Sequence, residues 1–312
     1  MRNRIENALQ FTIDLRTVNM YVCSIFLLLL VSLAFGFALP TDNTLNITEN
    51  FETQDYSDLG YFFSPREFDT EKIAGGNFAS EGQFPFMVVV HRLVGNGIIA
   101  QCGGTVLNRR WVLTAGHCIA EEPRRFFVVF GVTNKNGIGY DFNRGPGISM
   151  MTTIGALHPF YKQTRNDIGL LYMPMDIPYR NTIQPITLNR QSYDSFVDES
   201  SVVIGWGRDE RGNKGTKALK YAVLPVISNS ECGRYWNVDK RNICTAPGLG
   251  EDACQGDSGG PLVVVSSGRL VQIGIVSYGD SNCPSSRPGV FTRVSTYLPW
   301  INSVMRGNVG NM

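Results

Sequence analysis

Short runs of apolar, mostly β-branched residues recur along the chain from Ile73 onward, and clusters of Gly, Pro and Asn separate them. The runs have the length of strands, and the clusters supply the residues that turns require. Strands at this spacing are typical of an all-β barrel or sandwich. The closing stretch VSTYLPWINSVM instead has apolar residues at helical spacing, which predicts a short terminal helix. The runs are FMVVVHRLV, GTVLN, WVLTAG, FFVVFGV, DIGLLYM, SVVIGWG, YAVLPVI, PLVVV, LVQIGIVSYG and GVFTRV.

The segment before Ile73 has a different composition. An uncharged run with the sequence IFLLLLVSLAFGFALP predicts a secretory signal over residues 1–38, cleaved after Ala38, or else a retained signal anchor that would tether the protein to a membrane. Met20 is an alternative start, because the apolar run follows it closely. Residues 39–72 are polar and acidic without a helical period, so we expect a flexible pro-segment or linker there. Asn46 begins a glycosylation sequon, Asn-Ile-Thr, which fits a secreted, extracellular protein.

Charge and cysteine usage narrow the class of protein. The net charge of +1 gives no electrostatic reason to expect nucleic acid or an anionic membrane surface as the main partner. Of the seven cysteines, Cys23 lies in the apolar run, and the other six are an even number compatible with disulfides in an oxidising compartment. Free thiols and a zinc site are the alternatives. Zinc is disfavoured because no CxxC-type spacing occurs and only three histidines are present, so we expect no metal and no cofactor.

The stretch DACQGDSGGPL, residues 252–262, surrounds a serine with glycines. A serine hydroxyl becomes a nucleophile only beside a base, and the attacked carbonyl needs donors for its developing negative charge. The glycines would let the backbone approach a substrate, and the N–H groups of Gly256 and Ser258 could form an oxyanion hole. A glycine-rich turn between strands is the competing interpretation.

Two further motifs change that balance. LTAGHC contains His117, and NDIGLL contains Asp167 at the start of an apolar run. Alone, the histidine would be read as a structural residue and the aspartate as a turn or cap residue. Together with Ser258 they supply a base, an orienting carboxylate and a nucleophile.

The order and context of these motifs resemble the trypsin-like (chymotrypsin-fold) serine proteases. The resemblance implies two six-stranded antiparallel Greek-key β-barrels and a short C-terminal helix, with the protease domain over residues 73–312. His117 and Asp167 would come from the first barrel and Ser258 from the second. Protein or peptide substrates, an activating protease and protein protease inhibitors are the implied partners. The resemblance rests on the motifs IAGG, CGGTVLNRRWVLTAGHC, NDIGLL, GWG, DACQGDSGGPL, SYG and RPGVFTRV.

The resemblance also assigns roles. Ser258 would attack the peptide carbonyl, His117 would transfer the proton, and Asp167 would orient His117. From the fifteen pairings open to six cysteines, it selects one set. That set is Cys102–Cys118, Cys232–Cys244 and Cys254–Cys283.

The specificity pocket is assigned in the same way. Asp252 matches the family position at the pocket base, which implies cleavage after Arg and Lys. Gly279 and Gly289 match the walls, and Ser277 belongs to the strand that would bind the substrate backbone. Since Ala253 brings no hydroxyl that could help an ammonium, we expect arginine to be preferred over lysine.

Departures from the family pattern carry further expectations. The segment between Gly131 and Met151 contains no glutamate, so we expect no calcium site of the kind found in digestive trypsins. Pro288 stands where sodium-activated relatives carry Tyr, so we expect no sodium site either. Asn282 replaces a common glycine at the pocket entrance.

The junction DTEKIAGG, residues 69–76, resembles a zymogen activation site. Cleavage after Lys72 would free the amino terminus of Ile73, whose ammonium would pair with Asp257. Ala74 is unusual there, where Val is more common. The acidic Asp69 and Glu71 predict slow self-activation. A non-catalytic protease-like binding protein is the runner-up hypothesis, but such proteins usually lose a residue of the triad.

Overall fold

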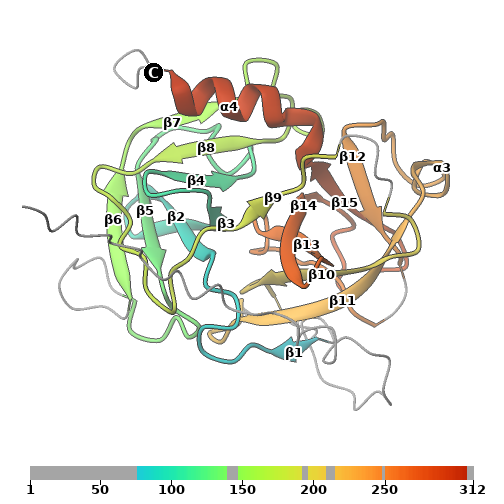
Figure 1. The fold of residues 1–312 in the computed structure, drawn as a ribbon, viewed down its shortest axis with the longest axis horizontal. Coiled ribbons are helices and arrows are strands. Elements are labelled where there is room, and N and C mark those ends of the chain that lie inside the picture. Colours follow the sequence, from blue (N-terminus) through green and yellow to red (C-terminus); the bar gives the residue numbers. More distant parts are fainter. Residues whose placement is uncertain (1–75, 139–146, 192–195, 209–214, 248–249, 308–312) are drawn as a thin grey trace, which may run out of the picture. The chain divides into compact units, whose positions relative to one another are not determined.

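The computed structural model describes residues 76–138, 147–191, 196–208, 215–247 and 250–307 (Figure 1). These residues form two curled, mainly antiparallel β-sheets, and a short helix ends the described chain. The all-β class, the two barrels and the terminal helix predicted from the sequence are therefore confirmed. The signal, the pro-segment, Asn46, Lys72 and Ile73 lie outside the described residues.

The first barrel is a seven-stranded sheet with the order β6-β5-β2-β3-β4-β8-β7. All its pairings are antiparallel, and the longest, between β2 and β3, joins Met87 with Thr105 at one end. The strands are β2 (Met87–Gly95), β3 (Ile98–Val106), β4 (Trp111–Thr114), β5 (Phe126–Phe130), β6 (Ile148–Thr152), β7 (Gly155–Leu157) and β8 (Gly169–Tyr172).

The second barrel is an eight-stranded sheet with the order β1-β11-β10-β13-β14-β15-β12, and a pairing of β11 with β12 closes it. β9 adds a short parallel pairing with β14. Without the two- and three-residue strands β1, β9 and β7, each barrel has six strands, as the resemblance implies. The strands are β1 (Asn77–Phe78), β9 (Thr187–Leu188), β10 (Ser200–Gly205), β11 (Lys220–Ile227), β12 (Asn242–Thr245), β13 (Pro261–Ser266), β14 (Arg269–Tyr278) and β15 (Gly289–Arg293).

Strand β5, FFVVF, shows how the two barrels are joined. All five of its residues are buried, because each face of the strand meets a different core. Phe126, Val128 and Phe130 face the interior of the first barrel. Phe127 and Val129 instead pack in a cluster that includes residues of β10 in the second barrel. Since alternate side chains of a strand point to opposite faces, an unbroken apolar run is what a strand between two cores requires.

Hydrogen bonds also connect the barrels. The Thr105 hydroxyl in β3 donates to the Gln272 side chain in β14 at 2.8 Å, and both residues are fully buried. The Gly103 N–H in β3 donates to the carbonyl oxygen of Ser258 at 2.8 Å. A Cβ atom at Gly103 would lie 3.1 Å from the Cα of Gly260, so the absence of a side chain allows this close approach. These contacts place the loop around Ser258 directly against the first barrel.

The helical segments are few. α3 (Asn229–Cys232) is capped by the Ser228 hydroxyl, which accepts from the Glu231 N–H. The 3-10 turn η1 (Val294–Tyr297) leads into α4 (Leu298–Arg306), where Pro299 occupies the first turn, in which its missing N–H costs nothing. Ile301 of α4 is fully buried in the core of the first barrel. The C-terminal helix therefore packs on the N-terminal barrel. Among the residues that the structure describes, no helix combines the length and apolarity needed to cross a membrane.

Candidate active site

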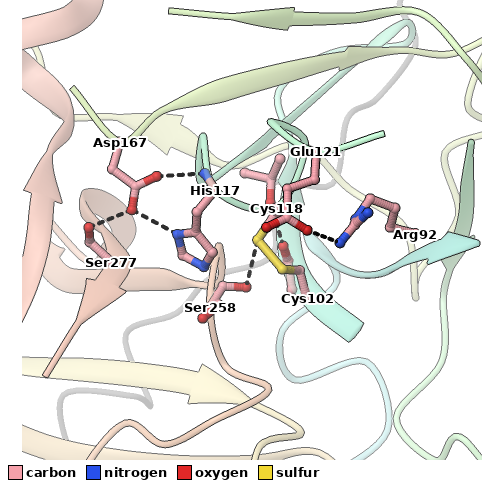
Figure 2. Close-up of a disulfide and its surroundings, with 10 residues drawn as sticks. Arg92, Cys102, His117, Cys118, Glu121, Asp167, Ser258 and Ser277 are labelled. Atoms are coloured by element: carbon pink, nitrogen blue, oxygen red, sulfur yellow. Dashed lines mark hydrogen bonds and ion pairs between the residues drawn. A yellow bond between two sulfur atoms is a disulfide. The ribbon is translucent and has the colours of Figure 1, made fainter. Parts of the chain in front are cut away.

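His117 and Asp167 are brought together by neighbouring strands of the first barrel. His117 lies in the turn that follows β4, and Asp167 lies just before β8, the strand that pairs with β4. The Asp167 carboxylate accepts from the His117 backbone N–H at 2.8 Å, and its Oδ2 lies 2.8 Å from His117 Nδ1 (Figure 2). Asp167 is almost fully buried, whereas the His117 side chain is partly exposed. This geometry holds the imidazole with Nε2 left for another partner.

The second barrel supplies further contacts to the same aspartate. The Ser277 hydroxyl in β14 donates to Asp167 Oδ2 at 2.6 Å (Figure 2). The Thr292 hydroxyl in β15 donates to the Asp167 backbone carbonyl at 2.8 Å. Asp167 is therefore fixed from both barrels. A buried carboxylate needs hydrogen-bond donors in place of water, and His117 and Ser277 provide them.

Ser258 lies in the turn between Cys254 and β13. Next to it, Gly259 has φ +81°, and a Cβ atom there would lie 2.3 Å from Thr114 Oγ1. Only glycine fits that position without displacing β4. The carbonyl oxygen of Ser258 also lies 3.6 Å from Cys118 Sγ, the residue after the histidine (Figure 2). Among the described residues, no hydrogen bond joins Ser258 Oγ to His117; such contacts commonly tighten only when substrate is bound.

The backbone around Ser258 presents two unused donors. Gly256 has φ +100°, a conformation that favours glycine. In the described part of the chain, neither the Gly256 N–H nor the Ser258 N–H has an acceptor. Two N–H groups without partners next to a serine hydroxyl could stabilise a developing oxyanion. Behind them, a Cβ atom at Gly256 would lie 3.4 Å from Gln101 Nε2, and Gln101 Oε1 accepts from Lys135 at 2.5 Å.

Asp257 points away from this surface into the protein. Its carboxylate accepts from the N–H of Gly207 at 2.6 Å and from that of Cys254 at 2.9 Å. A Cβ atom built on Gly205 would lie 2.0 Å from the Asp257 carboxylate, and one built on Gly207 would lie 2.3 Å from it. Both positions therefore need glycine to leave space for this carboxylate. Complete burial raises the pKa of Asp257 to about 6, against the two hydrogen bonds that lower it. A buried carboxylate with this pKa would gain from a nearby cation.

A cavity of about 250 Å³ opens beside Ser258. Gly279 and Gly289 both line it and lie close together, because a Cβ atom at Gly279 would be 3.9 Å from the Cα of Gly289. Any larger residue at either position would narrow the cavity. The residues that line it are Ala253, Cys254, Gln255, Ser258, Val276, Ser277, Tyr278, Gly279, Asp280, Ser281, Gly289, Val290 and Phe291.

Asp252 lies behind the wall of the cavity rather than on it. A Cβ atom at Gly289 would be 3.4 Å from Asp252 Oδ1, so the carboxylate faces the cavity through the gap that this glycine leaves. Burial raises the pKa of Asp252 to about 7, and the negative charges of Asp257 and Asp280 add to the rise. The backbone N–H groups of Ala253 and Ser285 oppose it. A buried carboxylate of this kind next to a cavity would favour a cationic group over a neutral one.

Three disulfides join the pairs that the resemblance implies: Cys102–Cys118, Cys232–Cys244 and Cys254–Cys283. The first ties the turn that carries His117 to β3, and the third ties the segment before Ser258 to the far side of the cavity. Cys102, His117 and Cys118 form the one grouping of metal-ligand residues in the described regions. Because the two cysteines are bonded to each other, these residues cannot hold a metal ion.

Several residues near the site were not anticipated from the sequence. Ser277 was expected to bind substrate backbone, and its bond to Asp167 was not foreseen. The same is true of Asp280 at the cavity, of the Ser285 N–H that approaches Asp252, and of Lys135 behind Gly256. Ser277 belongs to the SYG motif, but that motif gave no sign of a bond to Asp167, and the other three residues lie in none of the motifs found in the sequence.

Two β-barrels with a histidine, a buried aspartate and a glycine-flanked serine at their junction define a serine hydrolase of the chymotrypsin fold. The trypsin family model matches residues 73–301. Serine protease SP24D of Anopheles gambiae is 30% identical over 239 residues, which cover 77% of this chain and 83% of that protein. The solved structure of HL collagenase is similar with a TM-score of 0.65 and 27% identity, covering 75% of this chain and 98% of that one. The chain belongs to the trypsin family, and it is a serine endopeptidase.

Proposed function

We propose that the protein is a secreted endopeptidase, made as a zymogen, which cleaves peptide bonds after Arg and Lys. The observation that carries the proposal is the hydrogen-bonded chain from Ser277 through Asp167 to His117, together with the backbone N–H groups of Gly256 and Ser258, which have no acceptor among the described residues. The alternative is a binding protein on the same fold. Such a protein would have no use for a buried aspartate, whose burial costs free energy, beside a histidine.

In the proposed mechanism, His117 Nε2 accepts the hydroxyl proton of Ser258 as its oxygen attacks the substrate carbonyl. Asp167 holds the imidazole in the tautomer that leaves Nε2 free and stabilises the imidazolium that forms. The carbonyl oxygen becomes an oxyanion and accepts from the N–H groups of Gly256 and Ser258. His117 then returns the proton to the leaving amine, and water repeats the sequence on the acyl-enzyme.

The specificity follows from the cavity beside Ser258. Gly279 and Gly289 would leave room for a long side chain, and Asp252 would provide a negative charge behind the cavity wall at Gly289. A substrate guanidinium would donate two hydrogen bonds to that carboxylate. Taken alone, Ala253 favours arginine over lysine, since it offers no hydroxyl to an ammonium.

Activation would follow cleavage of the bond between Lys72 and Ile73. Asp257 is completely buried, accepts from the Gly207 N–H, and has a raised pKa although the charges of Lys135 and Lys220 lower it, so a direct ion pair with the ammonium freed on Ile73 would stabilise its ionised form. Pairing them would fix the turn that carries Gly256. Because Asp69 and Glu71 would oppose the charge of Asp252, a separate activating protease is expected rather than rapid self-cleavage.

A fluorophosphonate probe tests the proposal, because it reacts only with an activated serine. The secreted protein is treated with the probe before and after cleavage at Lys72. Labelling that appears after cleavage, and is lost in Ser258→Ala but kept in the exposed control Ser303→Ala, supports the proposal. Absence of labelling after complete cleavage would favour the binding-protein hypothesis. Sequencing of the secreted amino terminus checks removal of the signal after Ala38.

A further inference from the structure

Thr245, at the end of β12, has an unusual environment. Its side chain is fully buried, and its hydroxyl is the one buried side-chain polar atom in the described regions that has no hydrogen-bond partner. Buried hydroxyl groups are nearly always hydrogen-bonded, because an unpaired one loses its water without replacement. An orphan of this kind therefore needs an explanation.

The position of the hydroxyl supplies one. Thr245 pairs with Gly289 across β12 and β15. A Cβ atom at Gly289 would lie 3.0 Å from Thr245 Oγ1, 3.4 Å from Asp252 Oδ1 and 3.3 Å from Cε2 of Phe291, which lines the cavity. One point next to the cavity thus faces both the carboxylate and the unpartnered hydroxyl. The space exists because residue 289 has no side chain.

We propose that the Thr245 hydroxyl is a specificity-determining group that accepts a hydrogen bond from the ammonium of a substrate lysine held against Asp252. The inference rests on the proposed cleavage after basic residues, and it deepens that proposal by assigning the lysine a second partner. A lysine ammonium has three N–H donors, and a single carboxylate oxygen cannot accept from all of them. The remaining donors need other acceptors. The hydroxyl that Ala253 lacks is thereby supplied from the neighbouring strand.

Arginine depends on this hydroxyl less than lysine does. A planar guanidinium meets a carboxylate with two parallel hydrogen bonds, so Asp252 alone satisfies much of it. The ammonium is a compact charge that needs separate acceptors around it. Removing Thr245 Oγ1 should therefore lower kcat/KM on lysine substrates more than on arginine substrates.

The test compares Thr245→Val, which keeps the shape of the side chain, with Thr245→Ser, which keeps the hydroxyl. The substrates are two peptides that differ only in Lys or Arg before the scissile bond. We expect Thr245→Val to lower the ratio of kcat/KM for lysine over arginine by about tenfold, the effect of one lost hydrogen bond to a charged group. Thr245→Ser should restore the ratio. Equal losses on both peptides, or an unchanged ratio, would overturn the inference.

Thermal unfolding separates this role from a structural one. A hydroxyl that stabilised the fold would lower the melting temperature when removed. An unpartnered hydroxyl should leave the melting temperature unchanged or raise it in Thr245→Val, since no hydrogen bond is lost. A clear decrease would contradict the assignment. If the activated parent protein cleaves neither peptide and takes no fluorophosphonate label, the proposed function itself fails. If the parent protein cleaves both peptides and the lysine-to-arginine ratio of kcat/KM is the same in Thr245→Val, only this inference fails.

Discussion

The carboxylate of Asp252 offers a quantitative test of the cavity, with pH as the perturbation and Asp252→Asn as the matched variant. With a pKa of about 7, about half of the carboxylates are ionised at pH 7 and about one-tenth at pH 6. By the proposed specificity, a cation such as benzamidine should bind the ionised form of Asp252. Its affinity should therefore change little above about pH 8, fall about tenfold from pH 8 to pH 6, and fall about tenfold again by pH 5.

Calorimetric binding is the suitable assay, because reaction rates also depend on the proton transfers of the catalytic steps. At about 4 Å and an effective dielectric constant of about 20, the charge of Asp252 is worth about 4 kcal/mol to a bound cation. Asp252→Asn should then weaken benzamidine about a thousandfold at pH 8 and remove the pH dependence. Affinity that is constant from pH 5 to pH 8, or an Asn variant with the same slope, would refute the reasoning.

The ionised carboxylate of Asp252 should lower the free energy of unfolding of the protein when no ligand is bound. Because its pKa rises from 3.8 to about 7 on folding, the native state binds more protons between these values, and stability falls as the pH rises through that window. The full cost is reached above pH 7. Asp252→Asn should therefore stabilise the unliganded protein at pH 8, by up to about 4 kcal/mol, and hardly at all at pH 4. Urea unfolding at both pH values measures the difference.

Two substitutions test other parts of the site. Gly207→Ala would place a Cβ atom 2.3 Å from the Asp257 carboxylate, so a stability loss of about 3 kcal/mol or more is expected; Gly268→Ala, with φ +72° and open space around it, should cost only about 1 kcal/mol. Urea unfolding of both variants checks this, and equal losses would contradict it. Ser277→Ala removes a donor to Asp167 and should lower kcat about tenfold with little change in KM. An equal loss confined to KM would show that Ser277 acts on substrate instead.

The sequence predicted the fold because its signals are local and repeated. Apolar runs separated by turn residues predict strands wherever they occur in a chain. β5 and β10 were predicted from such runs. The motifs around His117, Asp167 and Ser258 indicated the candidate site in the same way, since each carries its own glycine or cysteine context.

What the sequence could not give are the contacts between distant segments. Ser277 reaches Asp167 across 110 positions, and the orphan hydroxyl of Thr245 becomes visible only when β12 is laid against β15. No periodicity or spacing encodes such a contact, because it depends on how two strands pack after the chain has folded. The sequence also gave no sign of the short strands β1, β7 and β9 that add to the six strands of each barrel, because two- and three-residue pairings leave no pattern in the sequence.

The attachment of Asp167 to both barrels has a consequence for the life of the chain. The first barrel leaves the ribosome carrying His117 and Asp167, while Ser258, Ser277 and Thr292 are still to be made. Until the second barrel docks, the imidazole has no nucleophile beside it and its aspartate lacks the donors from β14 and β15. A nascent or half-folded chain is therefore chemically harmless to the proteins around it. Splitting the centre between two halves protects the cell that makes the protein even before any pro-segment does so.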